Sequence, residues 1–220
     1  MAPTAMPEPL LRASPILECC DIAFERDFVP IFSGLSFALR RGEMLQVSGA
    51  NGAGKTTLLR MLATSLTPST GQILWRGECL ERCRAAYRSD LIYLGHQAGI
   101  KAELTPRENL HWLLPFHPNA SGSAEEALSA VGLSGLEDSP CVTLSAGQQR
   151  RVALARLHLS TATLWILDEP FTAIDRDGVS RLEQLMRAHT SRGGVVILTT
   201  HQPLGLDGVR LLEMEPYVCA

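Results

Sequence analysis

The chain has 220 residues, of which 45% are hydrophobic and 5% aromatic, and its formal net charge is -3 at pH 7. This length and composition suffice for one folded domain with a buried core. The slightly negative charge gives no sign of a polyanionic partner, so it argues against a protein that clamps DNA or threads RNA. We therefore expect no nucleic-acid partner.

The cysteines and the first residues bear on the cellular compartment. The six cysteines show no CxxC pair and no framework spacing, so we expect reduced thiols in a cytosolic protein. Cys79 and Cys83 could share a helix face as metal ligands, but without a second ligand pair packing is favoured. Residues 1–15 are rich in Pro and Ala and are expected to form a disordered tail. No stretch approaches the roughly 18 consecutive apolar residues of a membrane helix, so contact with a bilayer would require a partner protein.

Apolar patterns along the chain predict an α/β fold. Residues 16–24 and 32–40 predict two antiparallel strands near the N-terminus. Five further strands are expected in EMLQVSG, QILWRG, DLIYLG, TLWILDEP and GGVVILTTH. The last three of these runs are almost wholly apolar and alternate with helical stretches, which is typical of a parallel sheet with crossover helices.

The middle of the chain carries helix signals instead of strand signals. Thr105 and Glu108 can form a capping box, and Ser123 and Glu126 can form a second one. We expect a small helical subdomain, approximately residues 98–160, inserted into the α/β core.

A glycine-rich loop, GANGAGKTT, follows one predicted strand and opens a helix. Its glycines let successive backbone N–H groups surround a phosphate, and the helix N-terminus adds its positive end. Lys55 would reach the β- and γ-phosphates of a nucleotide, and the Thr56 hydroxyl would bind magnesium. A plain glycine turn is the alternative, although every fixed position of the phosphate-loop pattern is filled. The predicted nucleotide-binding residues are Gly49, Ala50, Asn51, Gly52, Ala53, Gly54, Lys55, Thr56 and Thr57.

Two adjacent acidic residues end the apolar run TLWILDEP. Asp168 would hold the magnesium shell, and Glu169 could polarise the attacking water as the catalytic base. Alone, the pair would more often be a solvated strand exit, but together with the phosphate loop the catalytic interpretation is preferred. Gln97, which follows the run DLIYLG, could add an amide oxygen. The predicted metal ligands are Thr56, Gln97 and Asp168.

His201 follows the run GGVVILTT and would reach the same sheet edge, where its imidazole could bond the γ-phosphate or water. A lone histidine is more often structural, and only the neighbouring motifs favour a catalytic role. Arg150, Arg151 and Arg156 are expected to form a solvated helix face. Surface or packing roles are expected for the remaining histidines, His96, His111, His117, His158 and His189.

The stretch LSAGQQRRVALARL offers a second place to hold an anion. Ser145 can cap a helix whose first turn includes Gly147, which leaves free backbone N–H groups. One compact domain cannot easily enclose a nucleotide from both sides, whereas two copies arranged head to tail could each offer this helix start to the other's phosphate loop. A well-capped amphipathic helix without a ligand is the alternative.

Taken in order, these motifs resemble the nucleotide-binding domain of ABC ATPases. The phosphate loop, Q-loop and signature of that family resemble GANGAGKTT, Gln97 and LSAGQ. Its Walker B, D-loop and switch histidine resemble LWILDEP, Asp175 in FTAID, and His201. The resemblance implies one such domain over residues 16–220, with a P-loop NTPase core, ATP and Mg²⁺ as cofactors, and a dimer with a second copy of the chain. The signature residues acting in trans would be Ser145, Ala146, Gly147 and Gln148.

Two positions depart from the general family pattern. Ala146 stands where the first signature glycine is usual, and its added methyl group is small. The aromatic residue that usually stacks on adenine falls near Arg26, with Phe24 and Phe28 as neighbours. An arginine plane can also stack on a base.

Several longer stretches, such as GHQAGIKAELTPRENL and LWILDEPFTAID, are similar to the ATP-binding subunits of the bacterial cytochrome c maturation system, the haem exporter ATPases. This resemblance implies a peripheral subunit on the cytoplasmic face of the inner membrane, bound to integral membrane subunits and powering haem export or handover. The alternatives are an ATPase of another small ABC exporter, a non-transport ABC ATPase, and a binding module with an inert site.

Overall fold

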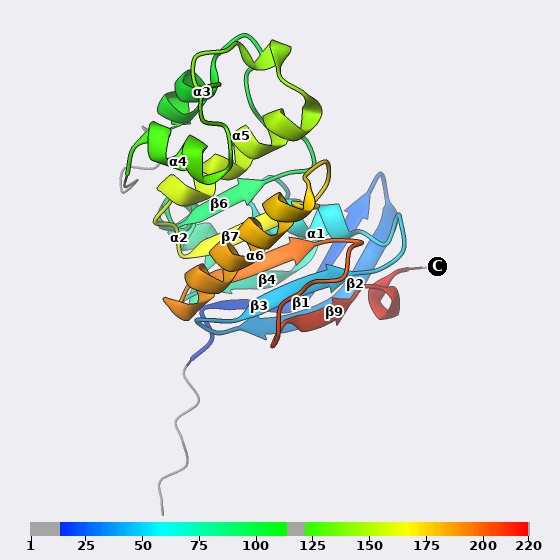
Figure 1. Ribbon diagram of the computed structural model, residues 1–220. Helices are drawn as coiled ribbons and strands as arrows, with labels where there is room; N and C mark the ends of the chain where they lie inside the picture. Colours follow the sequence, from blue (N-terminus) through cyan, green and yellow to red (C-terminus); the bar gives the residue numbers. More distant parts are fainter. Residues whose placement is uncertain (1–13, 114–121, 220) are drawn as a thin grey trace, which may run out of the picture.

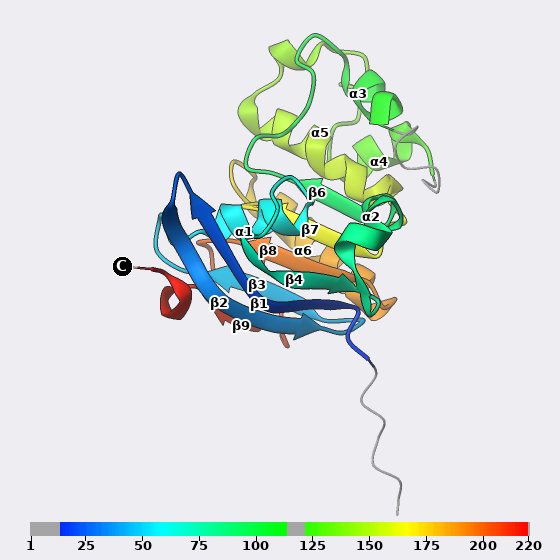
Figure 2. The same ribbon diagram turned by 180° about the vertical axis from the view of Figure 1, so that it is seen from behind.

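The computed structural model describes residues 14–113 and 122–219 (Figure 1). The expected tail, except for its last two positions, lies outside the described residues, and so does His117. The described part contains an antiparallel sheet, a parallel sheet and a group of helices at one end of the molecule (Figures 1 and 2). This arrangement confirms the predicted α/β fold class with an N-terminal antiparallel portion.

The antiparallel sheet contains the two strands predicted near the N-terminus, and its strand order is β2-β1-β4-β5. The strands are β1 (Leu17–Arg26), β2 (Val29–Leu39), β4 (Thr70–Trp75) and β5 (Glu78–Cys79). Leu17, Cys19 and Ile22 of β1 are buried, so the apolar pattern that predicts this strand also provides its inner face. β5 is not predicted from the sequence, because two residues are too few to show an alternation of apolar and polar side chains.

The second sheet has five parallel strands in the order β6-β7-β8-β3-β9. They are β3 (Met44–Ser48), β6 (Leu91–Leu94), β7 (Leu164–Asp168), β8 (Val195–Thr199) and β9 (Arg210–Glu213). Every residue of β7 and β8 is buried, which explains why their sequences are continuously apolar. The edge strand β9 buries only Leu212 and therefore leaves no clear pattern in the sequence.

Helices cover both faces of the parallel sheet (Figures 1 and 2). α1 (Lys55–Leu62) packs between the two sheets, while α6 (Arg176–Ser191) and part of α5 (Ala146–Leu159) pack on the opposite face of the parallel sheet. The remaining helices are α2 (Leu80–Ser89), α3 (Pro106–Leu113) and α4 (Ala124–Ala130), and short 3₁₀ turns span Cys141–Thr143 and Glu215–Tyr217.

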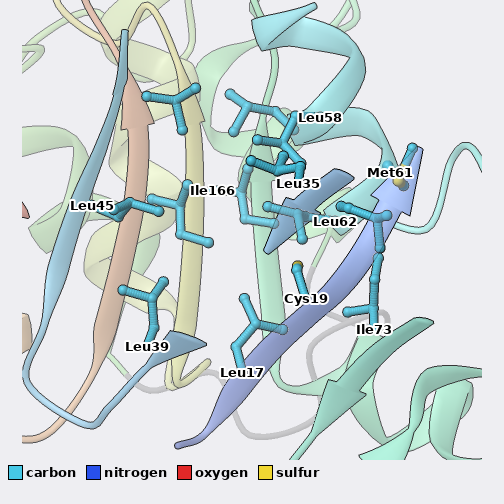
Figure 3. Close-up of a cluster of buried hydrophobic side chains, with 14 of the residues drawn as sticks. Leu17, Cys19, Leu35, Leu39, Leu45, Leu58, Met61, Leu62, Ile73 and Ile166 are labelled. Atoms are coloured by element: carbon cyan, nitrogen blue, oxygen red, sulfur yellow. The ribbon is translucent and has the colours of Figure 1, made fainter. Parts of the chain in front are cut away.

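The largest hydrophobic core fills the space between the two sheets (Figure 3). Leu58 and Leu62 of α1 lie there with Leu17 and Leu35 of the antiparallel sheet and Ile166 of β7. All five side chains are 0% exposed. Because α1 begins directly after the glycine-rich loop, this packing also fixes where that loop lies.

A smaller core joins α3, α4 and one side of α5. Thr105 with Glu108, and Ser123 with Glu126, form the two predicted capping boxes at the starts of α3 and α4. α5 also contributes Leu154 to the core on the parallel sheet, so it connects the helical group to that sheet. The limits of a separate helical subdomain stay a prediction.

The six cysteines are free thiols, and Cys83 donates a hydrogen bond to the carbonyl of Cys79 at 3.5 Å. No group of three or more His, Cys, Asp or Glu side chains within residues 14–113 and 122–219 is arranged to hold a metal. None of the helices in these two ranges combines the length and apolar character needed to span a membrane.

We predict that Leu58→Ala lowers the free energy of unfolding by about 2–5 kcal/mol, because it leaves a cavity in the core between the sheets. Leu211→Ala is the matched control, since Leu211 on β9 is 57% exposed, and its change should stay within about 0.5 kcal/mol. Urea denaturation of both variants measures the difference, and equal losses would contradict the assignment of α1 to the central core.

Candidate functional site

The glycine-rich loop connects β3 to α1 and has the backbone that its sequence requires. Gly54 stands at the N-cap of α1 with φ of 90°, a left-handed conformation that favours glycine. A Cβ atom there would lie 3.0 Å from the Phe32 ring, so the space is also tight. No side chain caps α1 at Gly54, so the first-turn N–H groups remain available to an anion.

Lys55 bends back over this loop. Its Nζ donates to the carbonyl oxygens of Gly49 at 2.6 Å and Ala50 at 3.0 Å. The ammonium group is therefore held at the mouth of the loop by two neutral acceptors, which an incoming phosphate oxygen can replace with a stronger charge-assisted bond.

A cavity of about 490 Å³ adjoins the loop and collects most of the predicted site residues. Lys55, Thr56, Asp168, Glu169 and His201 all line it. Other lining residues from the predicted phosphate loop are Asn51, Gly52, Gly54 and Thr57. Side chains from three separate motifs thus meet in one cavity.

Gln97 is exposed and is not among the residues that line this cavity, whereas its neighbour His96 is. The role of Gln97 as a magnesium ligand stays a prediction. Arg26 lines the cavity as well, while Phe24 is buried and Phe28 is 98% exposed. Of the three residues considered for stacking on adenine, Arg26 is therefore the one that lines the cavity.

A hydroxyl group links the ends of β7 and β8. Thr199 Oγ1 donates to Asp168 Oδ1 at 2.7 Å and accepts a hydrogen bond from the Glu169 N–H at 3.0 Å. Asp168 is 2% exposed, and its other oxygen, Oδ2, is buried without a hydrogen-bond partner among the described residues. A buried carboxylate oxygen of this kind, on a residue that lines the same cavity as Thr56, fits a hard cation such as Mg²⁺.

Glu169 and His201 lie next to each other at this edge of the sheet. Glu169 Oε1 is 3.5 Å from His201 Nε2, and the His201 side chain is 63% exposed. Glu169 has φ of 50°, in the left-handed region, which costs about 1–3 kcal/mol for a residue with a side chain. This pair can accept a proton from a water molecule in the cavity and can hold that water molecule in a fixed orientation.

The second anion-binding stretch begins α5, as its sequence predicts. Ser145 is the N-cap: its Oγ accepts from the Gln148 N–H at 3.2 Å, and its own N–H donates to Gln148 Oε1 at 2.8 Å. Ala146 is exposed. A Cβ atom on Gly147 would lie 2.5 Å from the carbonyl oxygen of Ala173, so only glycine fits there. None of these four residues is among those that line the cavity of the same chain.

Asp175 has a local structural role. It is the N-cap of α6, and its Oδ1 accepts from the Gly178 N–H at 2.8 Å. The segment from Glu169 to Asp175 therefore runs from the cavity to α6 and touches the start of α5 at Ala173.

The expectation of a solvated arginine face on α5 is wrong. Arg150 is 5% exposed, and burial lowers the pKa of Arg156 to about 10. Arg151 donates to the carbonyl oxygens of Val131 and Gly132 at the end of α4. The acceptors of Arg150 and Arg151 lie on other segments of the chain, which no local sequence pattern reveals.

Histidines outside the predicted site include one packing residue. His189 is buried, and its ring stacks on Trp165 with the two centroids 3.8 Å apart. This confirms a packing role for His189. His96 is exposed, in agreement with a surface role, and it also lines the cavity.

The sequence of this chain is similar to those of ABC transporter proteins. The profile of the ABC transporter family matches residues 32–172. The cytochrome c biogenesis ATP-binding export protein CcmA 2 of Salmonella paratyphi A is 56% identical over 201 residues, which are 90% of this chain and 97% of that protein. The protein CcmA of Escherichia coli, which bears the same descriptive name, is 55% identical over 192 residues, or 87% of this chain and 91% of that protein.

Solved structures agree on the fold. An ABC transporter ATP-binding protein from Pyrococcus furiosus has a TM-score of 0.79 at 25% identity and covers 92% of this chain and 99% of its own. The ATP-binding cassette MJ0796, solved as a dimer in a post-hydrolysis state with ADP and Pi, has a TM-score of 0.74 at 21% identity over 84% of this chain and 88% of its own. The chain therefore belongs to the ABC transporter family, as one of its ATP-binding proteins.

Proposed function

We propose that this chain is the ATP-hydrolysing subunit of an ABC transporter complex that serves cytochrome c biogenesis. The observation that carries the proposal is the single cavity in which Lys55, Thr56, Asp168, Glu169 and His201 meet. The identity of 55–56% to cytochrome c biogenesis ATP-binding export proteins supports the biological assignment.

The phosphate loop would hold the triphosphate of ATP. Lys55 exchanges its bonds to the carbonyl oxygens of Gly49 and Ala50 for bonds to the β- and γ-phosphates, and the α1 N-terminus adds backbone donors. Thr56 and Asp168 would hold Mg²⁺, with Gln97 as a further proposed ligand. When bound, this cation neutralises charge that develops on the phosphate oxygens.

Hydrolysis then needs a base beside the γ-phosphate. Glu169 would accept a proton from water as the water oxygen bonds to the γ-phosphorus and the bond to the bridging oxygen breaks, giving ADP and phosphate. His201, 3.5 Å from Glu169, would hold the water or the γ-phosphate in place. Thr199 accepts from the backbone N–H of Glu169 and donates to one oxygen of Asp168, so it links the backbone of the proposed base to the proposed metal ligand.

A second copy of the chain would complete the site. The capping box engages the N–H groups of Ser145 and Gln148, while those of Ala146 and Gly147 are first-turn groups that an anion can accept from. Because these residues do not line the cavity of their own chain, we propose that they bind the γ-phosphate in the partner chain. ATP would then favour the closed dimer, and hydrolysis would remove that preference.

The transporter complex would also contain integral membrane subunits, and this chain would bind them from the cytoplasmic face of the bacterial inner membrane. Haem export or haem handover is the proposed task. An ATPase of another small exporter is the second candidate, and identification of the membrane proteins that co-purify with the chain distinguishes the two.

We predict that Glu169→Gln lowers the rate of ATP hydrolysis by about 10²–10⁴-fold, while ATP binding and ATP-dependent dimerisation persist. The amide keeps the size of the side chain but cannot accept the proton from water. Phosphate release and light scattering measure the two properties. Glu213→Gln on the exposed edge of β9 is the control, and normal turnover by Glu169→Gln would rule out this residue as the base.

We predict that Lys55→Ala chains and Ser145→Arg chains, each inactive alone, recover hydrolysis when mixed. A mixed dimer has one intact site, built from Lys55 of one chain and Ser145 of the other, so random pairing restores about a quarter of the sites. Mixing Lys55→Ala chains with chains that carry both substitutions is the control, because no intact site can form. Absence of recovery in the first mixture would argue against a shared site.

We predict that Thr199→Val lowers hydrolysis by up to about 100-fold, because the Asp168 carboxylate and the Glu169 backbone lose their common hydrogen-bond partner. The variant should also lose about 1–3 kcal/mol of stability, since the Glu169 N–H and Asp168 Oδ1 lose a partner. Thr190→Val is the control, because the bonds described for that hydroxyl are to the carbonyl groups of Met186 and Arg187 within α6. Similar turnover in both variants would contradict the anchoring role.

A further inference from the structure

Arg150 connects three segments around the proposed ATPase site. It lies in the second turn of α5 and is 5% exposed. Its Nη1 donates to the carbonyl oxygens of Gly95 at 2.9 Å and His96 at 3.5 Å, just after β6. Its Nη2 donates to those of Asp168 at 3.0 Å and Glu169 at 2.9 Å, at the end of β7. One guanidinium group therefore joins the signature helix to two loops that lead into the cavity.

A charged group is a costly way to fill this position. Burial lowers the pKa of Arg150, and its Nε is buried without a hydrogen-bond partner among the described residues. The hydrogen bonds described for it are to neutral carbonyl groups, which offset only part of the lost hydration. A planar fork of donors does, however, hold two pairs of carbonyl groups in fixed directions, which an apolar residue cannot do.

The two hydrogen bonds from Arg150 at the end of β7 lie on either side of the Glu169 Cα atom. The Asp168 carbonyl precedes the Glu169 Cα atom and the Glu169 carbonyl follows it, so Arg150 holds both flanking peptide groups. Thr199 holds the N–H of the same residue. Together they secure a backbone whose φ of 50° is unfavourable for a glutamate.

We propose that Arg150 is a positioning residue for hydrolysis. It orients the Glu169 carboxylate by holding the Glu169 backbone, and it couples the position of this backbone to that of helix α5. This inference rests on the proposed ATPase function. Arg150 is not among the residues that line the cavity, so it acts through Glu169 and not on the nucleotide. A shift of α5 would reach the Glu169 backbone through this side chain.

The first test compares Arg150→Gln and Arg150→Lys in the full chain. Arg150→Gln should lower kcat by about 10–100-fold, while the KM for ATP and the affinity for ATP change less than about threefold. Arg150→Lys, which keeps the charge but loses the fork, should recover part of kcat. Arg151→Gln is the matched control on the same helix, because its contacts are to the end of α4, and it should keep the parent kcat.

The second test asks whether Arg150 acts through Glu169. Arg150→Gln in the Glu169→Gln background should cause less than about a threefold further loss of hydrolysis, because the base is already absent. Equal fractional losses in both backgrounds would overturn the assignment, and so would an unchanged kcat. Normal turnover by Glu169→Gln alone would instead contradict the proposed base, so the two failures are distinguishable. If both Arg150 variants lose cooperative thermal unfolding, Arg150 serves stability and the assignment is wrong.

Discussion

The parallel pairing of β3, β8 and β7 is the constraint on which the site depends. Val47 of β3 and Asp168 of β7 both pair with Thr199 of β8, so the phosphate loop, the acidic pair and His201 leave the sheet side by side. Adjacent strands lie about 4.8 Å apart, which places side chains from distant parts of the chain within reach of one bound molecule. The hydrogen bond between Thr199 on β8 and Asp168 on β7 is specific to this register.

The same sheet edge contains several features that do not favour stability. Glu169 has a left-handed backbone, Asp168 Oδ2 is buried without a partner among the described residues, and Arg150 is a buried charge. The core between the sheets, where α1 inserts Leu58 and Leu62, supplies the burial that offsets these costs. The left-handed backbone of Glu169 and the unpaired oxygen of Asp168 belong to residues that line the cavity, where a ligand can engage them.

Local chemistry made much of this fold predictable from the sequence. Continuous apolar runs identify β7 and β8, and the capping boxes at Thr105 and Ser123 depend only on residues three positions apart. The burial of Arg150 was missed because its acceptors come from segments 18 to 55 residues away along the chain, which no local pattern reveals. The loop after β6 likewise has no period to show that His96, and not Gln97, lines the cavity.

The contact between Gly147 and Ala173 has a consequence for the proposed dimer. Ala173 lies between Glu169 and Asp175, and its carbonyl occupies the space that a side chain at position 147 would need. The start of α5, which is proposed to face the partner's phosphate, therefore contacts the segment that follows Glu169, the proposed base. Arg150, three residues further along α5, donates to the backbone carbonyl of Glu169. Nucleotide binding at one shared site of the proposed dimer would thus affect the other site through these two contacts, which both lie near the start of α5.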